Sequence, residues 1–109
     1  MNKYEVVLSE RVESFLSGLE ESARKKFTKA FSKLEEGHHT GDHFCKLPGT
    51  DNIYEFRVQD SGKWYRVLSY PKKSKTGFAF VTTHGFQKKG NKTPKKEIQI
   101  AERIRREEL

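Results

Sequence analysis

Cationic and aromatic side chains share one stretch of the sequence that contains no carboxylate. Ten lysine and arginine residues lie between Asp60 and Glu97, namely Lys63, Arg66, Lys72, Lys73, Lys75, Lys88, Lys89, Lys92, Lys95 and Lys96. Trp64, Tyr65, Tyr70, Phe78, Phe80 and Phe86 are interleaved with them. Cations neutralise phosphates and rings stack on bases, so the stretch predicts a nucleic-acid partner. The competing interpretation is a solvated basic face above core aromatics, and composition alone does not separate the two.

Side chains suited to proton transfer are few in the same stretch. Lys88 and Lys89 are adjacent, and such a pair suits either proton transfer or RNA binding. His84 is the one histidine outside residues 38–43. Because imidazole titrates near neutral pH, it is the most conventional acid or base available. The alternative for His84 is a hydrogen-bonded scaffold role at a strand end.

A second group of polar side chains precedes this stretch. His38, His39, Asp42, His43 and Cys45 are all of types that bind zinc. Their spacing matches no common zinc pattern, and adjacent histidines point in different directions in most backbones. A polar loop is therefore the preferred interpretation, and the sequence predicts neither a metal nor another cofactor. With a single cysteine, the chain has no internal disulfide, which fits a reducing compartment.

Length and composition set further bounds. A chain of 109 residues predicts a single domain, 1–109, with two packed layers around one core. Only 33% of residues are hydrophobic, but eight Phe and four Tyr supply enough bulk for a compact core. The formal net charge is +7. Neither a signal peptide nor a run of about 20 apolar residues is expected, so the predicted location is the cytoplasm.

The first half of the sequence predicts one strand and two helices. Residues 4–8 are an apolar, β-branched run, and Ser9 is suited to cap a following helix. Apolar residues then recur at helical spacing in two sets, Val12, Phe15, Leu16 and Leu19, and Ala23, Phe27, Ala30, Phe31 and Leu34. Gly18 and Gly37 mark the two helix ends. Residues 38–52 are expected to form a long connection.

The second half predicts a three-stranded meander and a last helix. Strands are expected at 54–58, 64–70 and 78–83, with a tight turn at 60–62 and a basic loop at 71–77. Arg57 and Arg66 then become neighbours across the first hairpin.

His84-Gly85-Phe86 is expected to end the third strand, and Thr93 and Pro94 to open the helix as N-cap and first residue. The resulting order is βααβββα. It defines an α+β domain with a small, antiparallel-dominated sheet, an N-terminal helix pair and a C-terminal helix. The helices are expected to pack on one face and leave the other open.

Five motifs in this order resemble those of a known family. They are Leu47-Pro48-Gly49, Ile53-Tyr54-Glu55-Phe56-Arg57-Val58, Trp64-Tyr65-Arg66-Val67, His84-Gly85-Phe86-Gln87-Lys88-Lys89 and Lys92-Thr93-Pro94. Over nearly the whole chain the arrangement resembles the RelE/ParE toxin superfamily, with the phage-derived, HigB-like toxins as the nearest branch. The resemblance implies a RelE-like fold and the toxin role in a type II toxin-antitoxin system.

The resemblance also implies an activity and partners. Toxins of this kind are small, basic, metal-independent endoribonucleases that enter the A site of the 70S ribosome and cut translated mRNA. Each is neutralised by an antitoxin encoded beside it, and a small helix-turn-helix protein is expected here. Whether an antitoxin covers the basic face or makes the complex too bulky for the A site stays open.

Roles for individual cations follow from the resemblance and from the chemistry of RNA cleavage. That chemistry needs a deprotonated 2′-hydroxyl, charge stabilisation on the phosphorane and a proton for the departing 5′-oxygen. Arg66 matches the family's Tyr-Arg-aliphatic strand and is assigned to the transition-state phosphate, and Arg57 to the same or a neighbouring phosphate. For both arginines the alternative is an ion pair with Glu55 or another acid.

Lys88 and Lys89 stand where related toxins place basic active-site residues, and His84 completes the candidate catalytic set. RNA-backbone contacts are expected from Lys72, Lys73, Lys75, Lys92, Lys95 and Lys96, and Tyr65 is a candidate for stacking on a base. HigB-like enzymes often use histidine and acidic groups late in the chain. This sequence instead ends in Arg105-Arg106-Glu107-Glu108-Leu109, so the general base stays open.

Two other functions compete with the nuclease. ParE-type relatives poison DNA gyrase by protein contact, although the paired strand arginines and the Lys88-Lys89 pair argue against this assignment. A non-catalytic domain could instead bind RNA or DNA through its basic face, in which case no single residue would be indispensable.

Overall fold

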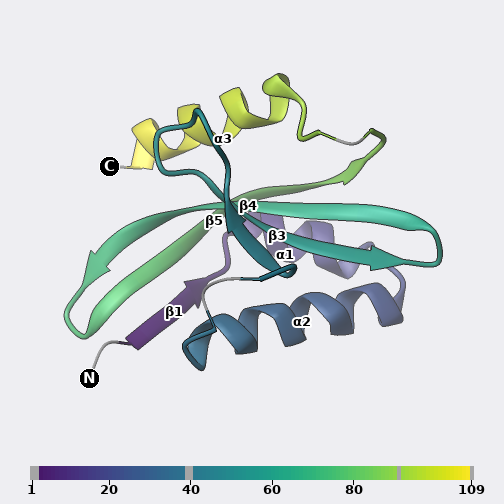
Figure 1. Ribbon diagram of the computed structural model, residues 1–109, viewed down its shortest axis with the longest axis horizontal. Helices are drawn as coiled ribbons and strands as arrows, with labels where there is room; N and C mark the ends of the chain where they lie inside the picture. The colour runs from purple at the N-terminus through teal and green to yellow at the C-terminus, as the bar shows by residue number, and fades with distance from the viewer. Residues whose placement is uncertain (1–2, 39–40, 91, 109) are drawn as a thin grey trace.

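A computed structural model describes residues 3–38, 41–90 and 92–108, and its elements confirm the α+β class (Figure 1). The helices are α1 (Glu10–Ser17), α2 (Glu21–Glu35) and α3 (Lys95–Glu108). The strands are β1 (Lys3–Val7), β2 (Phe44–Lys46), β3 (Tyr54–Asp60), β4 (Lys63–Ser74) and β5 (Gly77–Lys88). The predicted order holds, and the three-residue β2 is an addition within the stretch expected to be a connection.

The described strands form a five-stranded sheet in the order β1-β5-β4-β3-β2. β1 runs parallel to β5, and the other neighbouring pairs are antiparallel, so the sheet is antiparallel-dominated as predicted. No helix among the described residues is both long and apolar enough to cross a membrane.

Helices α1 and α2 close one face of the sheet. Ser9 caps α1 as predicted, because its side-chain oxygen accepts a hydrogen bond from the Val12 backbone N–H at 3.2 Å. Phe27 of α2 is fully buried in the apolar core between these helices and the sheet. Gly85 permits the close approach of α1, since a Cβ atom there would lie 2.3 Å from the ring of Phe15.

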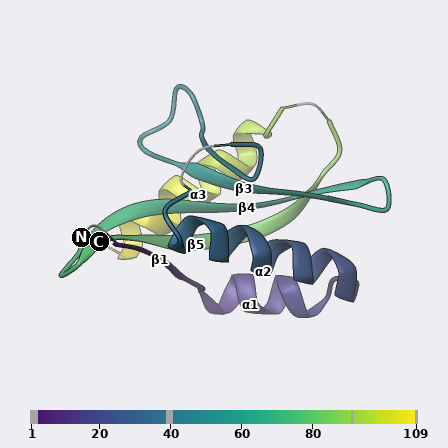
Figure 2. The same cartoon turned by 60° about the horizontal axis from the view of Figure 1, so that its bottom comes forward.

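Helix α3 packs on the opposite face, so the expectation that all helices share one face is wrong (Figure 2). Ala101 of α3 is buried against Leu68 and Tyr70, with Phe86 packed alongside. Leu68 and Tyr70 reach this face by ordinary alternation with Val67 along β4. The register between β4 and β5 is irregular, because Val67 pairs with Gly85 but Ser69 pairs with Thr82. The extra residue in β5 reverses its side-chain alternation, and Phe86 thereby joins the apolar surface that α3 covers.

Strands β4 and β5 are longer than predicted. The expected basic loop at 71–77 continues as strand to Ser74, and β5 runs from Gly77 through 84–86 to Lys88. Pro71 is compatible with a strand here because β3 begins at Tyr54, opposite Ser69, and does not extend to Pro71. Pro71 therefore pairs with β5 alone and lies at an edge on its other side. The hairpin carries Lys72, Lys73 and Lys75 to its tip, at the same end of the sheet as β1 (Figure 1).

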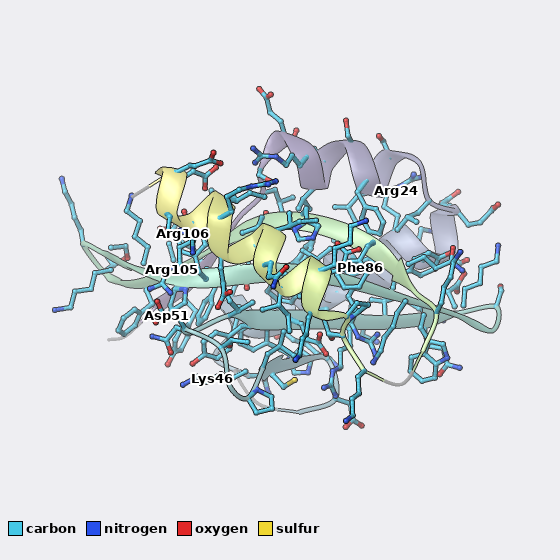
Figure 3. All side chains as sticks on the ribbon, turned by 90° about the horizontal axis from the view of Figure 1, so that it is seen from above. Arg24, Lys46, Asp51, Phe86, Arg105 and Arg106 are labelled. Atoms are coloured by element: carbon cyan, nitrogen blue, oxygen red, sulfur yellow. The ribbon has the colours of Figure 1, made fainter. Side chains whose placement is uncertain are left out.

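Helix α3 begins at Lys95, and the first backbone hydrogen bonds run from Glu97 and Ile98 to the Pro94 carbonyl. Thr93, the predicted N-cap, instead donates its hydroxyl to a side chain of the sheet. At the other end of α3, Arg105 Nη1 lies 3.3 Å from Asp51 Oδ2 and also donates to the Asp51 carbonyl (Figure 3). These contacts fasten α3 to the loop before β3.

Candidate active site

The two strand arginines are brought together on the α3 side of the sheet. Arg57 of β3 and Arg66 of β4 are direct cross-strand partners, as predicted. Ser61 and Gly62 adopt φ angles of 51° and 77° in the two-residue turn that joins the strands, and this turn fixes the register. Because Phe56 and Val58 face α1 and α2, Arg57 between them points away from those helices.

A buried carboxylate holds this arginine pair. The Glu55 side chain is 1% exposed, and its Oε1 atom lies 2.8 Å from Arg57 Nε and 3.4 Å from Arg66 Nε. Its other oxygen accepts a hydrogen bond from the Thr93 hydroxyl at 2.5 Å. One carboxylate faces two guanidinium groups, so the cluster keeps a net positive charge. The ion pair weighed from the sequence as the alternative is present, and it positions the arginines.

The two arginines differ in access to solvent. The Arg66 side chain is 4% exposed, whereas that of Arg57 is 40% exposed. Arg66 donates from Nη1 to the Tyr65 carbonyl at 3.0 Å, and its guanidinium carbon lies 5.5 Å from the centroid of the Trp64 ring. Burial lowers the pKa of Arg66, and the charge of Arg57 lowers it further, against the attraction of Glu55. Arginine nevertheless stays a fixed cation, with Arg57 as the accessible one.

Of the hollows that Arg57 lines, two also contain another residue of the predicted catalytic set, Arg66 in one and Lys88 in the other. The first, of about 470 Å³, is lined by Arg57 and Arg66 together with Trp64, Asp42 and His43. Trp64 is 45% exposed there, so its ring is available for stacking on a base. His43, considered in the sequence only as part of a polar loop, reaches this site because the Arg57 N–H donates to the His43 carbonyl at 3.0 Å.

The second hollow, of about 440 Å³, lies below the N-terminal end of α3. Cationic side chains that line it are Arg57, Lys88, Lys92 and Lys95, and Glu55 and Thr93 also contribute. Burial lowers the pKa of Lys88, and the positive charge of Arg66 lowers it further. A lysine of lowered pKa gives up its proton more readily than an ordinary one, which suits proton transfer. The helix N-terminus adds to the attraction for anions.

His84 lies outside both hollows. Its Nε2 is 3.0 Å from Glu97 Oε1, its Nδ1 is 3.1 Å from the Thr83 hydroxyl, and its ring stacks on Phe86. Burial lowers the pKa of His84, although Glu97 acts to raise it. The geometry fits the scaffold interpretation rather than the catalytic one, because both ring nitrogens have partners and the contact with Glu97 fastens α3 to β5.

Other residues predicted for the site are spread more widely. Tyr65 is 7% exposed within the core beneath α1 and α2, so the expectation that it stacks on RNA is wrong. It points away from the arginines because successive strand residues alternate between faces. Lys73 lies seven residues beyond Arg66, about 23 Å along an extended strand. Lys72 and Lys75 share that hairpin tip.

Two further lysines lie apart from the arginine pair. Lys89 is exposed beyond the end of β5. Lys96 belongs to the outer surface of α3, where it lines a shallow depression with Arg103 and Arg106. Neither lysine lines the two hollows that meet at Arg57.

The metal hypothesis was considered for residues 38–45. Within the described part of the chain, no three His, Cys, Asp or Glu side chains are grouped to hold a metal ion, and His39 lies outside it. Residues that sequence reasoning missed are Glu55 as a positioning group, Thr93 as its hydrogen-bond donor, and Trp64 and His43 as lining residues. The available signal was that Glu55 alternates onto the same side of its strand as Arg57, next to the strand that carries Arg66.

Comparison with solved structures identifies the fold as that of the RelE toxins. A free arginine-to-alanine mutant of the E. coli toxin RelE matches with a TM-score of 0.64 at 15% identity, covering 98% of this chain and 99% of that one. The intact E. coli RelBE toxin-antitoxin complex matches at 0.58 and 18% identity, covering 80% and 99%. The RelE-RelB complex of Pyrococcus horikoshii OT3 matches at 0.53 and 22% identity, covering 72% and 90%.

The family model of the phage derived protein Gp49-like family matches residues 14–106, so the chain belongs to that family. The predicted RelE-like fold and the predicted resemblance to a phage-derived family are thereby confirmed. No curated protein matches the chain.

Proposed function

We propose that this protein is the toxin of a type II toxin-antitoxin system and cleaves translated mRNA in the A site of the 70S ribosome. The observation that carries the proposal is the Arg57 and Arg66 pair, held by buried Glu55 where two cation-lined hollows meet. A cognate antitoxin, encoded beside the toxin, is the expected partner, since matched RelE structures are complexes with RelB. Such a toxin acts in the cytoplasm, where translation takes place.

The proposed reaction uses the nucleophile that RNA supplies. The 2′-oxygen loses its proton and attacks the adjacent phosphorus, and the bond from phosphorus to the 5′-oxygen breaks, leaving a 2′,3′-cyclic phosphate. Arg57 binds the non-bridging oxygens directly, and Arg66 adds positive charge from the floor of the hollow. Lys88 lies beside them with a lowered pKa and is the residue best placed to protonate the 5′-oxygen. Fixed cations thus perform the charge stabilisation without a metal ion.

Arg66 also supports the fold, because it partners the buried Glu55 carboxylate. Its loss would leave buried Glu55 short of a partner and could unfold the sheet. Exposed Arg57 is the cleaner target, because its side chain is 40% exposed. Arg66→Lys keeps a cation on the floor but loses the planar guanidinium that lies beside Glu55 and donates to the Tyr65 carbonyl.

The test is to induce the wild type, Arg57→Ala and Arg66→Lys in a bacterium and to map mRNA 5′ ends within translated frames. Arg57→Ala is expected to cleave about 10²- to 10³-fold more slowly, the usual cost of losing one charge-stabilising group. Arg66→Lys keeps the charge and is expected to cleave more slowly than the wild type but faster than Arg57→Ala. Arg103→Ala, an exposed arginine on α3, is the matched control and should cleave like the wild type. Cuts in register with codons support the nuclease. Growth arrest with intact mRNA would overturn it and favour inhibition of DNA gyrase.

A further inference from the structure

An aromatic hollow lies at the other end of the sheet, on the face that α2 covers only in part. It measures about 300 Å³, and its walls include Tyr4, Phe44, Tyr54, Phe78 and Phe80. Phe78 is 42% exposed, one of the most exposed large apolar side chains in the described part of the chain. The arginine pair plays no part in this aromatic hollow, since the two are separated along β4. An exposed ring beside a hollow whose other walls include buried Phe44 and Phe80 is typical of an interaction site.

The packing of the rings indicates what the hollow accepts. Phe44 and Tyr54 stack on each other, with centroids 5.2 Å apart and planes at 11°. Phe80 meets both edge-on, at 85° to Phe44 and 74° to Tyr54. Because the rings occupy one another's faces, the hollow offers no flat platform for a stacked base. It fits an inserted apolar side chain instead, as in the pockets that hold anchor residues at protein interfaces.

Lysines flank the aromatic hollow on two sides. Lys46 is the register partner of Tyr54, and Lys73 is the register partner of Phe78, so both lysines lie on the same face as the rings. On the α2 side, the carboxylate of Glu35 is engaged by the Val6 backbone N–H at 3.1 Å. An apolar floor with cationic edges is complementary to an acidic segment that carries one large apolar residue.

We propose that the aromatic hollow docks the cognate antitoxin, through an acidic segment that inserts an aromatic or branched aliphatic side chain beside Phe78. The inference rests on the proposed toxin function for the identity of the partner. It assigns antitoxin binding to the β1 and β4–β5 end of the sheet, and RNA cleavage to the Arg57 end. The two activities are therefore separable by mutation.

The chain offers a matched pair of variants for the test. Phe78→Asp places a charge in the hollow, and the 42% exposure of Phe78 makes the change compatible with folding. Val7→Asp is the control, because Val7 is 41% exposed on the same pair of strands. Val7 pairs with Val81, on the opposite face from Tyr4 and Phe78. Thermal melts of both variants establish that they fold.

The measurement is calorimetric titration of each purified variant with the purified product of the gene adjoining that of the toxin. Phe78→Asp is expected to raise Kd by about 100-fold or more, the loss typical of an interface anchor. Val7→Asp should bind as the wild type does. The double variant Lys46→Glu/Lys73→Glu should bind about tenfold more weakly, with the deficit reduced in high salt.

Four outcomes would overturn the docking site: no complex with the wild type, unchanged binding by Phe78→Asp, equal weakening by Val7→Asp, or Phe78-dependent dimers of the isolated chain. Protection of Phe78 by a single-stranded RNA oligonucleotide instead of the partner would also overturn it. Cleavage of mRNA is assayed separately and should be unchanged in Phe78→Asp. A Phe78-dependent complex without cleavage supports the docking site and rejects the nuclease, whereas cleavage without such a complex does the reverse.

Discussion

The two faces of the sheet have contrasting interiors. On the α1 and α2 face the interior is apolar, with the Phe31 and Phe56 rings packed edge-to-face at 4.8 Å. On the α3 face, Glu55 and Arg66 are buried beside the smaller apolar cluster of Leu68, Tyr70 and Ala101. A buried ionic cluster carries a desolvation cost that an apolar core avoids. The contrast teaches that the α1 and α2 face stabilises the fold, while the α3 face also holds charge, at some cost to stability, in the position where the proposed reaction needs it.

Replacing the whole ionic cluster should separate the two roles most completely. In Glu55→Leu/Arg57→Met/Arg66→Met, cleavage is expected to fall by more than about 10³-fold, because phosphate stabilisation is lost. The free energy of unfolding should stay unchanged or rise by about 1–4 kcal/mol, since no buried charge remains. Urea denaturation and mRNA 5′-end mapping measure the two quantities. A triple variant that unfolds would show that the cluster stabilises the fold, against the contrast drawn between the faces.

Truncating a side chain on the α1 and α2 face should lower the stability of the fold and leave cleavage unchanged. Phe56→Ala removes a fully buried ring adjacent to Arg57 in β3. It is expected to cost about 3–5 kcal/mol of unfolding free energy. Cleavage per folded molecule should change little, because neighbouring Arg57 points to the other side. Urea denaturation gives the stability, and cleavage assayed below the melting temperature gives the activity. A folded Phe56→Ala protein without activity would contradict this division of roles.

The elements set by local rules were predictable from the sequence. Two helices followed from 3.6-residue spacing, Ser9 was identified as a cap, and a two-residue turn placed Arg57 opposite Arg66. What could not be predicted depended on distant partners. The extra residue in β5 between Thr82 and Gly85 is invisible in composition, yet it decides that Phe86 lies on the face that α3 covers.

The surroundings of Arg57 and Arg66 were hard to predict for the same reason, because they depend on residues that are distant in the chain. Tyr65 and Trp64 are adjacent rings of similar chemistry, and strand alternation alone decides that Trp64 is exposed and Tyr65 buried. Thr93 obeys a local capping rule in the sequence, but a carboxylate that is 38 residues away in the chain accepts its hydroxyl. The arginines were found because their strands are adjacent, whereas Glu55 as their shared partner required the assembled sheet.

A hydrogen bond from Thr93 joins the ionic cluster to the loop before α3, and its loss should have a smaller effect. Thr93→Val keeps the shape of the side chain but leaves Glu55 Oε2 without the hydroxyl at 2.5 Å. The expected cost is about 1 kcal/mol of unfolding free energy. Cleavage should fall several-fold, because Lys92 and Lys95 are less well positioned. Thr76→Val, at the exposed hairpin tip, is the control, and an equal effect there would exclude a specific role for Thr93.

The attachment of α3 should also depend on pH, whereas the apolar contacts of α1 and α2 have no such dependence. Burial holds the pKa of His84 below its ordinary 6.5, against Glu97 and with some help from Arg11. Between the lowered folded pKa and 6.5, the unfolded chain binds the proton and the folded chain does not. Stability therefore rises with pH through this window and levels off above it.

The contribution of His84 to this pH dependence can be isolated by comparing variants over the same pH range. His84→Gln should remove part of the rise in unfolding free energy between about pH 5 and 7, measured by urea denaturation. His43→Gln should keep the full rise if the rise belongs to His84, because His43 lies just before β2, the edge strand that β3 and β4 separate from β5, and its ring contacts the His38 carbonyl. An unchanged pH profile in His84→Gln would show that α3 is held independently of imidazole charge. The two faces would then differ in buried charge alone and not in their response to pH.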